Sequence, residues 1–115
     1  MTYQIIIQVG RYIEKGQQST DFQGFKYHTY ERFPGHARGL TLAVMACRNM
    51  LKADAHHIQR SDIRLKIVAP HTEDGGFMSD EKLFDLLWLA NENPRTLFND
   101  CKEYMSEQWD VKAAA

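Results

Sequence analysis

The dipeptide Pro34-Gly35 separates two segments of the chain that differ in hydrophobic periodicity. Before it, apolar residues alternate with other residues in two runs, which is the period of a β-strand. After it, apolar residues recur every three or four positions, which is the period of an amphipathic helix. Because both periods occur within 115 residues, the sequence predicts one domain that mixes strands and helices.

The first segment predicts two strands that form a hairpin. The first strand runs from Tyr3 to Val9 and is expected in the interior of a sheet, because one of its faces is entirely apolar. The second strand begins after a polar stretch and ends at Phe33-Pro34, since proline gives a ladder no donor. On this strand Phe25, Tyr27 and Thr29 are predicted to share one face, and the opposite face is predicted to carry Lys26, His28, Tyr30 and Arg32.

The second segment opens with the most regular element of the chain, a helix predicted from Gly35 to about Ile58. Gly35 is the expected N-cap, because no Ser, Thr, Asp or Asn stands at this helix start. One stripe of the helix is apolar and is expected to cover the sheet. We expect Leu40, Val44, Cys47 and Leu51 of this stripe to be buried against Ile5, Ile7, Leu65 and Ile67.

Three further elements are predicted after this helix. A strand with Ile63, Leu65 and Ile67 on its buried face follows Ser61-Asp62 and is expected to join the sheet. The polar stretch 69–78, with paired glycines, is predicted to be a mobile loop. One helix is expected after the N-cap Ser79 and another from Pro94, whereas residues 111–115 are expected to fray.

These elements predict an α+β fold for residues 1–115 as a single domain. The expected order is β-β-α-β-α-α, and the expected architecture is a two-layer sandwich in which helices cover one face of a small sheet. The order of the strands in the sheet is left open by the sequence.

Composition excludes several classes of protein. The chain is 43% hydrophobic and 25% charged with a formal net charge of −1, which argues against a strongly basic nucleic-acid binder and a strongly acidic mimic of DNA. We see neither a secretory signal nor an apolar stretch of membrane-spanning length, so a cytoplasmic location is expected. Cys47 and Cys101 are accordingly predicted to be reduced core residues, a disulfide being conceivable only if their helices pack face to face.

The sequence predicts no catalytic residue, no cofactor and no metal site. The expected first strand and first helix lack the clustered carboxylates that a two-metal nuclease needs, and no phosphate-binding glycine loop is present. Adjacent His56 and His57 would point in different directions on a helix, which disfavours a zinc site. A Cys47 nucleophile is disfavoured because the apolar stripe would bury the thiol. One enzymatic alternative remains: a loop site that contains His71, Glu73 and Asp74.

The candidate binding residues follow one another along the predicted long helix, opposite its apolar stripe. They are spaced by three, four or seven positions and are expected to form an outward row: Arg38, Met45, Arg48 and Lys52. An exposed methionine between arginines is typical of a protein interface. The alternatives are an ordinary solvated helix face and a phosphate-binding strip that also uses Lys26, His28 and Arg32.

We therefore expect a small cytoplasmic, non-catalytic binding or regulatory protein that acts through protein–protein contacts. A regulator, an assembly subunit and a phage-type inhibitor all fit this description, and the partner could be a second copy of the chain in a homodimer. The first alternative is a nucleic-acid-binding accessory protein that uses the basic helix face. The second alternative is a small enzyme with the His71 loop as its site.

Overall fold

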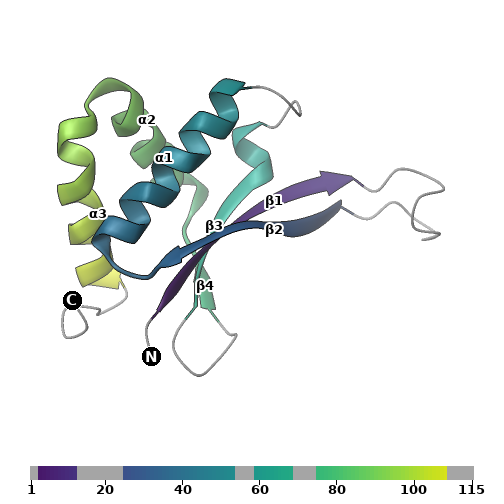
Figure 1. Ribbon diagram of the computed structural model, residues 1–115, viewed down its shortest axis with the longest axis horizontal. Coiled ribbons are helices and arrows are strands. Elements are labelled where there is room, and N and C mark those ends of the chain that lie inside the picture. The colour runs from purple at the N-terminus through teal and green to yellow at the C-terminus, as the bar shows by residue number, and fades with distance from the viewer. Residues whose placement is uncertain (1–2, 13–24, 54–58, 69–74, 109–115) are drawn as a thin grey trace.

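The protein is an α+β domain in which three helices pack on one face of an antiparallel sheet (Figure 1). The computed structural model describes residues 3–12, 25–53, 59–68 and 75–108. Its elements are β1 (Gln4–Tyr12), β2 (Phe25–Pro34), α1 (Ala37–Ala53), the short 3₁₀ helix η1 (Arg60–Asp62), β3 (Ile63–Val68), β4 (Gly75–Phe77), α2 (Asp80–Glu92) and α3 (Pro94–Gln108). The predicted fold class is thereby confirmed.

The described strands form one sheet in the order β2-β1-β3-β4, with every neighbouring pair antiparallel. β1 is an interior strand, as its apolar character predicts, and pairs with β2 on one side and β3 on the other. Strand β4 differs from the sequence-based expectation, because its residues belong to the stretch 69–78, for which the sequence predicts a loop. Glycines have low strand propensity, so three residues with two glycines carry no strand pattern, and pairing with β3 establishes the strand. Residues 69–74 lie outside the described residues.

A register shift in the hairpin changes which face of β2 each residue occupies. Between Ile7 and Gln8 the pairing moves from Glu31 to Thr29, so one residue of β2 is skipped. A one-residue bulge reverses the faces of all residues beyond it. His28 therefore pairs with Val9 on the helix side of the sheet, whereas Arg32 lies opposite Ile6 on the other side. The prediction that Lys26, His28 and Arg32 share one face is wrong for this reason.

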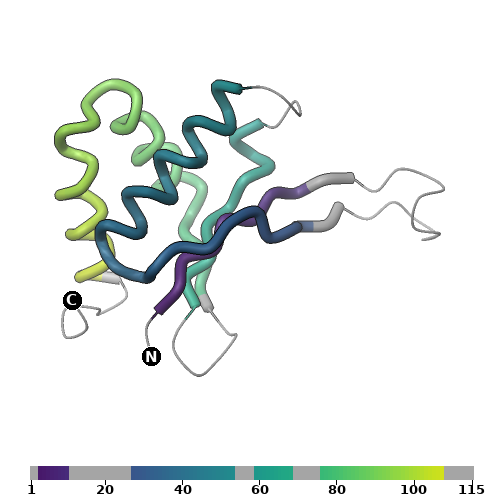
Figure 2. The backbone as a smooth tube through the Cα atoms, in the orientation of Figure 1, coloured from purple at the N-terminus to yellow at the C-terminus, as the bar shows by residue number. Residues whose placement is uncertain are grey.

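The chain passes from β2 into α1 through a tight turn (Figure 2). The amide of Gly35 donates to the carbonyl oxygen of Tyr3 at 2.7 Å, and a Cβ at Gly35 would collide with Tyr3. The helix begins at Ala37, so its N-cap is His36 rather than Gly35. The His36 Nδ1 atom accepts a hydrogen bond from the amide of Gly39 at 3.1 Å, which satisfies one of the unpaired donors of the first turn.

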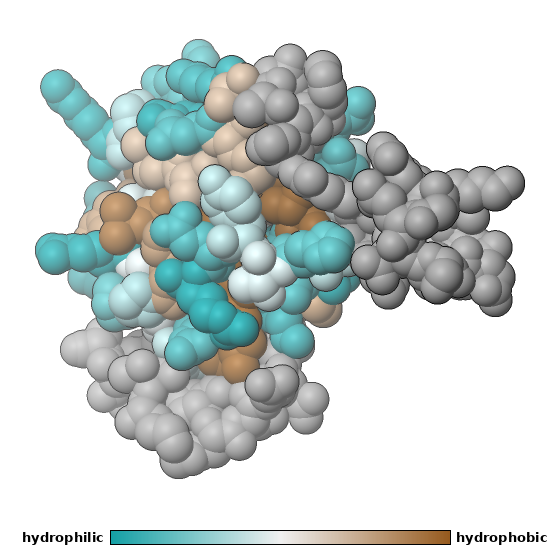
Figure 3. Space-filling model, turned by 45° about the vertical axis from the view of Figure 1, so that its right-hand side comes forward, coloured by the Kyte–Doolittle hydropathy of each residue, from teal (hydrophilic) through white to brown (hydrophobic). Residues whose placement is uncertain are grey.

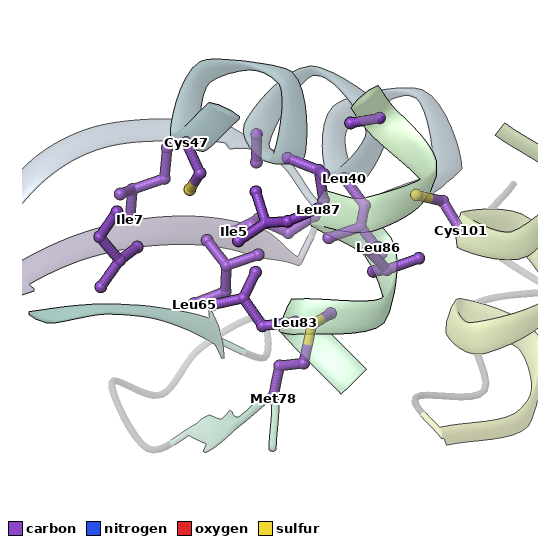
Figure 4. Close-up of a cluster of buried hydrophobic side chains, with 14 of the residues drawn as sticks. Ile5, Ile7, Leu40, Cys47, Leu65, Met78, Leu83, Leu86, Leu87 and Cys101 are labelled. Atoms are coloured by element: carbon purple, nitrogen blue, oxygen red, sulfur yellow. The ribbon is translucent and has the colours of Figure 1, made fainter. Parts of the chain in front are cut away.

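The core lies between the sheet and the helices, with Leu40 and Cys47 facing Ile5, Ile7 and Leu65 (Figure 4). Helix α3 packs mainly on α1 and α2 and completes the core with Leu97, Cys101 and Met105. Leu40, Val44 and Cys47 are fully buried together with Ile5, Ile7, Leu65 and Ile67, as predicted. Leu51 differs, because it is only half-buried at the edge of this core. The helix is described to Ala53, and residues 54–58 lie outside the described residues.

The remaining helices begin where the sequence predicts. The hydroxyl of Ser79 accepts a hydrogen bond from the amide of Lys82 at 3.2 Å and so caps α2, and α3 begins at Pro94. Among the described residues, no helix is both long and apolar enough to cross a membrane. The terminal residues 111–115, which were expected to fray, lie outside the described residues.

Candidate functional site

The four candidate residues on α1 do not form one outward surface. Arg38 and Lys52 are exposed, whereas Met45 and Arg48 between them are half-buried, and Met45 packs against the core cluster. Arg48 bonds to Ala90 of α2, and α1 packs on both α2 and α3. A helical wheel separates a core stripe from its opposite face but does not show that a second layer of helices covers part of that face.

Arg48 is held by specific hydrogen bonds. Its Nη1 donates to the carbonyl oxygen of Ala90 at 3.0 Å, in the last turn of α2. Its Nε and Nη2 donate to the side-chain oxygen of Asn49, at 3.2 Å and 2.9 Å. A guanidinium at the C-terminal end of a helix also lies close to the negative end of the helix dipole. Arg48 therefore fixes the position of α2 relative to α1.

Beside Arg48 lies a hollow of about 240 Å³, where the end of α1 meets α2 and η1. Its apolar wall consists of Leu51, Leu87 and Trp88, and its polar rim of Arg48, Lys52, Arg60 and Asn91. Trp88 is 63% exposed, the largest exposed fraction among the exposed large hydrophobic residues that the structure describes. An indole left in water next to an apolar wall is surface that a partner could cover.

The rim of the hollow is positively charged. Among the residues that the structure describes, three cations and no carboxylate line it. Arg60 lies over the ring of Phe84, with 4.6 Å between its guanidinium carbon and the ring centroid, so its side chain is positioned against α2. In the described parts of the chain nothing forms a hydrogen bond or an ion pair with Lys52. Within the described residues, the hollow therefore combines an apolar wall with a positively charged rim.

The size of the hollow argues against a site for a cofactor. Pockets for drug-sized ligands and cofactors usually measure about 300–1,000 Å³, whereas this hollow is smaller and open to solvent. Among the residues that the structure describes, the titratable lining consists of Arg48, Lys52 and Arg60. The hollow has room for one large side chain of another molecule.

A second hollow, of about 460 Å³, lies between Phe77 and helix α3. Carboxylates dominate it, with Asp100, Glu103 and Glu107 on one side. Lys82 extends over the ring of Tyr104, with 5.8 Å between the ammonium nitrogen and the ring centroid. Such a group of surface carboxylates, by itself, does not define a site.

Both cysteines are free and buried, as predicted from their positions on apolar stripes. Burial raises the pKa of the Cys47 thiol to about 12. For Cys101, burial and the neighbouring Asp100 raise the pKa to about 11, against a smaller lowering by Thr41 and Lys82. A thiol with such a pKa is not a nucleophile at neutral pH, because the thiolate is the reactive form.

The histidines present no metal site within the described ranges. No group of three or more His, Cys, Asp or Glu residues that could hold a metal ion occurs in those ranges. His36 caps α1 and His28 is exposed on β2. His56, His57 and the loop residues His71, Glu73 and Asp74 lie outside the described residues, so the enzymatic alternative is untested.

Sequence reasoning did not identify Trp88 and Arg60 as parts of a site. A signal for Trp88 exists, because the buried residues Leu83, Leu86, Leu87 and Ala90 leave position 88 outside the core stripe of α2. A large apolar ring outside the core stripe of a helix points to an exposed contact. Arg60 gives no such signal, since only the fold brings η1 next to α2.

The surface shown in Figure 3 is a mosaic, in which hydrophilic residues separate several hydrophobic patches. No protein-family model, curated protein or solved structure matches the chain. The candidate site therefore depends on the geometry and chemistry of the hollow.

Proposed function

We propose that the protein is a binding protein that docks an acidic segment of a protein partner in the hollow beside Trp88. The single observation that carries this proposal is the exposed Trp88 on an apolar wall whose rim is made of cations. An apolar or aromatic side chain of the partner would fill the hollow. Carboxylates that flank this side chain would lie against Lys52 and Arg60.

Two features of the hollow favour a protein partner. Tryptophan and arginine are enriched among the residues that contribute most to protein–protein binding, and such residues lie in or beside small pockets. Charge complementarity then determines which segments bind and how fast they associate. A hollow that has room for one side chain and a charged rim is suited to bind a short segment of the partner that inserts one apolar or aromatic side chain.

The proposal keeps Lys52 as a binding residue, assigns Arg48 to the packing of α2 on α1, and sets Arg38 and Met45 aside. Arg38 is ten residues before Arg48 on α1, which corresponds to about 15 Å along the helix axis. Met45 contributes to the packing of α1 on its neighbours. The proposed partner is a different protein. Self-association of the purified protein would show instead that the partner is a second copy of the chain.

The proposal is tested by comparing what tagged variants capture from a lysate of the native host, with quantitative mass spectrometry as the readout. Trp88→Ala removes the apolar contact and Lys52→Glu reverses one charge of the rim. Lys102→Glu makes the same charge reversal at an exposed position of α3, away from the hollow, and is the matched control. Circular dichroism checks that all three variants fold.

We expect one or a few proteins that the unchanged protein and Lys102→Glu capture equally. The two hollow variants should capture at least about tenfold less of these proteins, because a central tryptophan typically contributes about 2 kcal/mol or more. Equal capture by all folded variants would contradict the proposal. So would capture that Lys102→Glu weakens as much as Lys52→Glu does.

A further inference from the structure

The sheet face opposite the helices carries a cluster of cations and aromatic rings. Arg64 and Lys66 alternate along β3 with the core residues, so both lie on this face, and Arg32 lies there on β2. Glu31 is the one acidic residue within the described strands. It pairs with the core residue Ile7 and so lies on the helix side. Among the described strand residues, the opposite face therefore has cations without a carboxylate.

Arg64 is the centre of this cluster. Its guanidinium lies between two rings, with 3.5 Å to the centroid of Tyr27 and 4.1 Å to the centroid of Phe77. Its Nε donates to the side-chain oxygen of Gln8 at 2.8 Å. Within the described ranges its two terminal nitrogens have no hydrogen-bond partner. A guanidinium held in this way loses little side-chain entropy when it binds a phosphate through both nitrogens.

The register of the sheet places two further cations near Arg64. One row across the four strands of the sheet consists of residues that pair with their neighbours in turn: Arg32, Ile6, Lys66 and Phe77. The Cα atoms of Arg32 and Lys66 are therefore about 10 Å apart across β1, and Arg64 is about 7 Å from Lys66 along β3. Lys66 also contacts the ring of Phe77, with 5.6 Å between its nitrogen and the ring centroid.

Charge is segregated among the residues that the structure describes. Helices α2 and α3 carry most of the described carboxylates, namely Asp80, Glu81, Asp85, Glu92, Asp100, Glu103 and Glu107. The cations on the sheet face lie on the side away from these helices. Such a separation attracts an anion towards the sheet face, even though the net charge of the chain is only −1.

We propose that this face binds single-stranded nucleic acid. Phosphates would bind Arg32, Arg64 and Lys66, and an unpaired base would stack on the exposed ring of Phe77, which is 46% exposed. The rings favour a single strand, because the bases of a duplex are already stacked and offer no free face. This site is separate from the hollow beside Trp88, so neither proposal depends on the other.

The test measures fluorescence anisotropy of labelled 20-nucleotide oligo-dT and oligo-U with the full-length protein, at 50 to 200 mM salt. We expect binding with a dissociation constant of about 1–100 µM at physiological salt and a slope of log affinity against log salt near −2, about 0.7 for each cation. A duplex of the same length should bind more weakly. No binding to either oligonucleotide at 50 mM salt would overturn the proposal.

Variants test whether binding occurs on this face, and they separate the phosphate contacts of the cations from base stacking on Phe77. The double variant Arg32→Glu, Lys66→Glu should lose at least tenfold in affinity at 50 mM salt and give a flatter salt dependence. Phe77→Ala should lose about fivefold with an unchanged slope, because stacking does not release counterions. Lys102→Glu on α3 is the control for a charge reversal elsewhere and should bind like the unchanged protein. Equal affinities for all folded variants would overturn the site.

A competition distinguishes nucleic acid from an acidic polypeptide. Unlabelled oligo-dT should displace the labelled strand at a lower concentration of charge than poly-glutamate does, because the polypeptide has no bases to stack on Phe77. Equal displacement by both polymers would assign the face to acidic proteins and overturn the nucleic-acid proposal.

Discussion

At the scale of single residues, Arg48 changes from a surface contact to a link between helices. The sequence places it on the face opposite the apolar stripe, where charge reversal would be harmless to the fold. In the structure its Nη1 donates to the Ala90 carbonyl oxygen, and its chain is half-buried. Charge reversal to glutamate would therefore place a carboxylate beside a carbonyl oxygen and destabilise the fold.

Arg48→Met tests this link, because methionine keeps the apolar stem and removes the donors. We expect a loss of about 1–2 kcal/mol in the free energy of unfolding, the cost of losing a hydrogen bond from a charged group. Lys52→Met, one turn further along α1 and exposed, is the matched control and should change stability by less than about 0.5 kcal/mol. Urea denaturation measures both, and equal losses would show that Arg48 contributes nothing through Ala90.

A second prediction at this scale concerns the buried thiol of Cys47. Because burial raises the pKa of Cys47 from 9.0 to about 12, the unfolded chain releases this proton first as the pH rises. The protonated thiol therefore makes its full contribution to the free energy of unfolding below about pH 9. This contribution is lost as the pH rises through the pKa of the folded protein. The free energy of unfolding should fall by about 1 kcal/mol more in the unchanged protein than in Cys47→Ala between pH 8 and pH 10. Parallel pH profiles would refute this.

At the scale of elements, the start of α1 depends on a histidine cap. The sequence offers no common capping residue here, and the side chain of His36 takes this role by accepting from the amide of Gly39. Gly39 is needed for packing, because a Cβ at this position would collide with the carbonyl oxygen of Pro34. The turn between β2 and α1 therefore has little freedom to accept other residues.

Substitutions at position 36 test the cap. His36→Ala should lower the free energy of unfolding by about 1 kcal/mol, since the Gly39 amide loses its acceptor. His36→Asn should restore most of this loss, because asparagine is among the best N-cap residues. Thermal unfolding of the three proteins measures the difference. If His36→Ala is as stable as the unchanged protein, the imidazole does not cap the helix.

The strands and helices with strong periodicity could be predicted from the sequence, and the weakly patterned ones could not. Alternation identified β1 and β3, and the N-cap Ser79 and the first helical residue Pro94 located the starts of α2 and α3. Strand β4 has two glycines in three residues, so its pairing with β3 is decided by the tertiary structure. The bulge in the hairpin could not be predicted from the sequence either, because a skipped residue changes which face of the sheet each β2 residue occupies without changing the composition of the strand.

At the scale of the whole molecule, the packing of the helices determines where both proposed surfaces lie. Three helices cover one sheet face and leave the opposite face of the described strands to its cations and rings. The hollow forms where α1, α2 and η1 meet, and it needs residues from all three elements. Within the proposed site, Lys52 is a residue that the sequence predicts for binding, whereas the sequence gives no signal for Arg60, because the hollow forms only after the elements have packed.

The central claim is that Trp88 anchors a protein partner, and titration calorimetry with the captured partner tests it most directly. Trp88 is 63% exposed, so Trp88→Ala leaves the core intact. We predict that this substitution weakens binding about 30-fold or more, as expected for a residue that contributes about 2 kcal/mol or more. An affinity within twofold of that of the unchanged protein, with the variant folded, would contradict the claim.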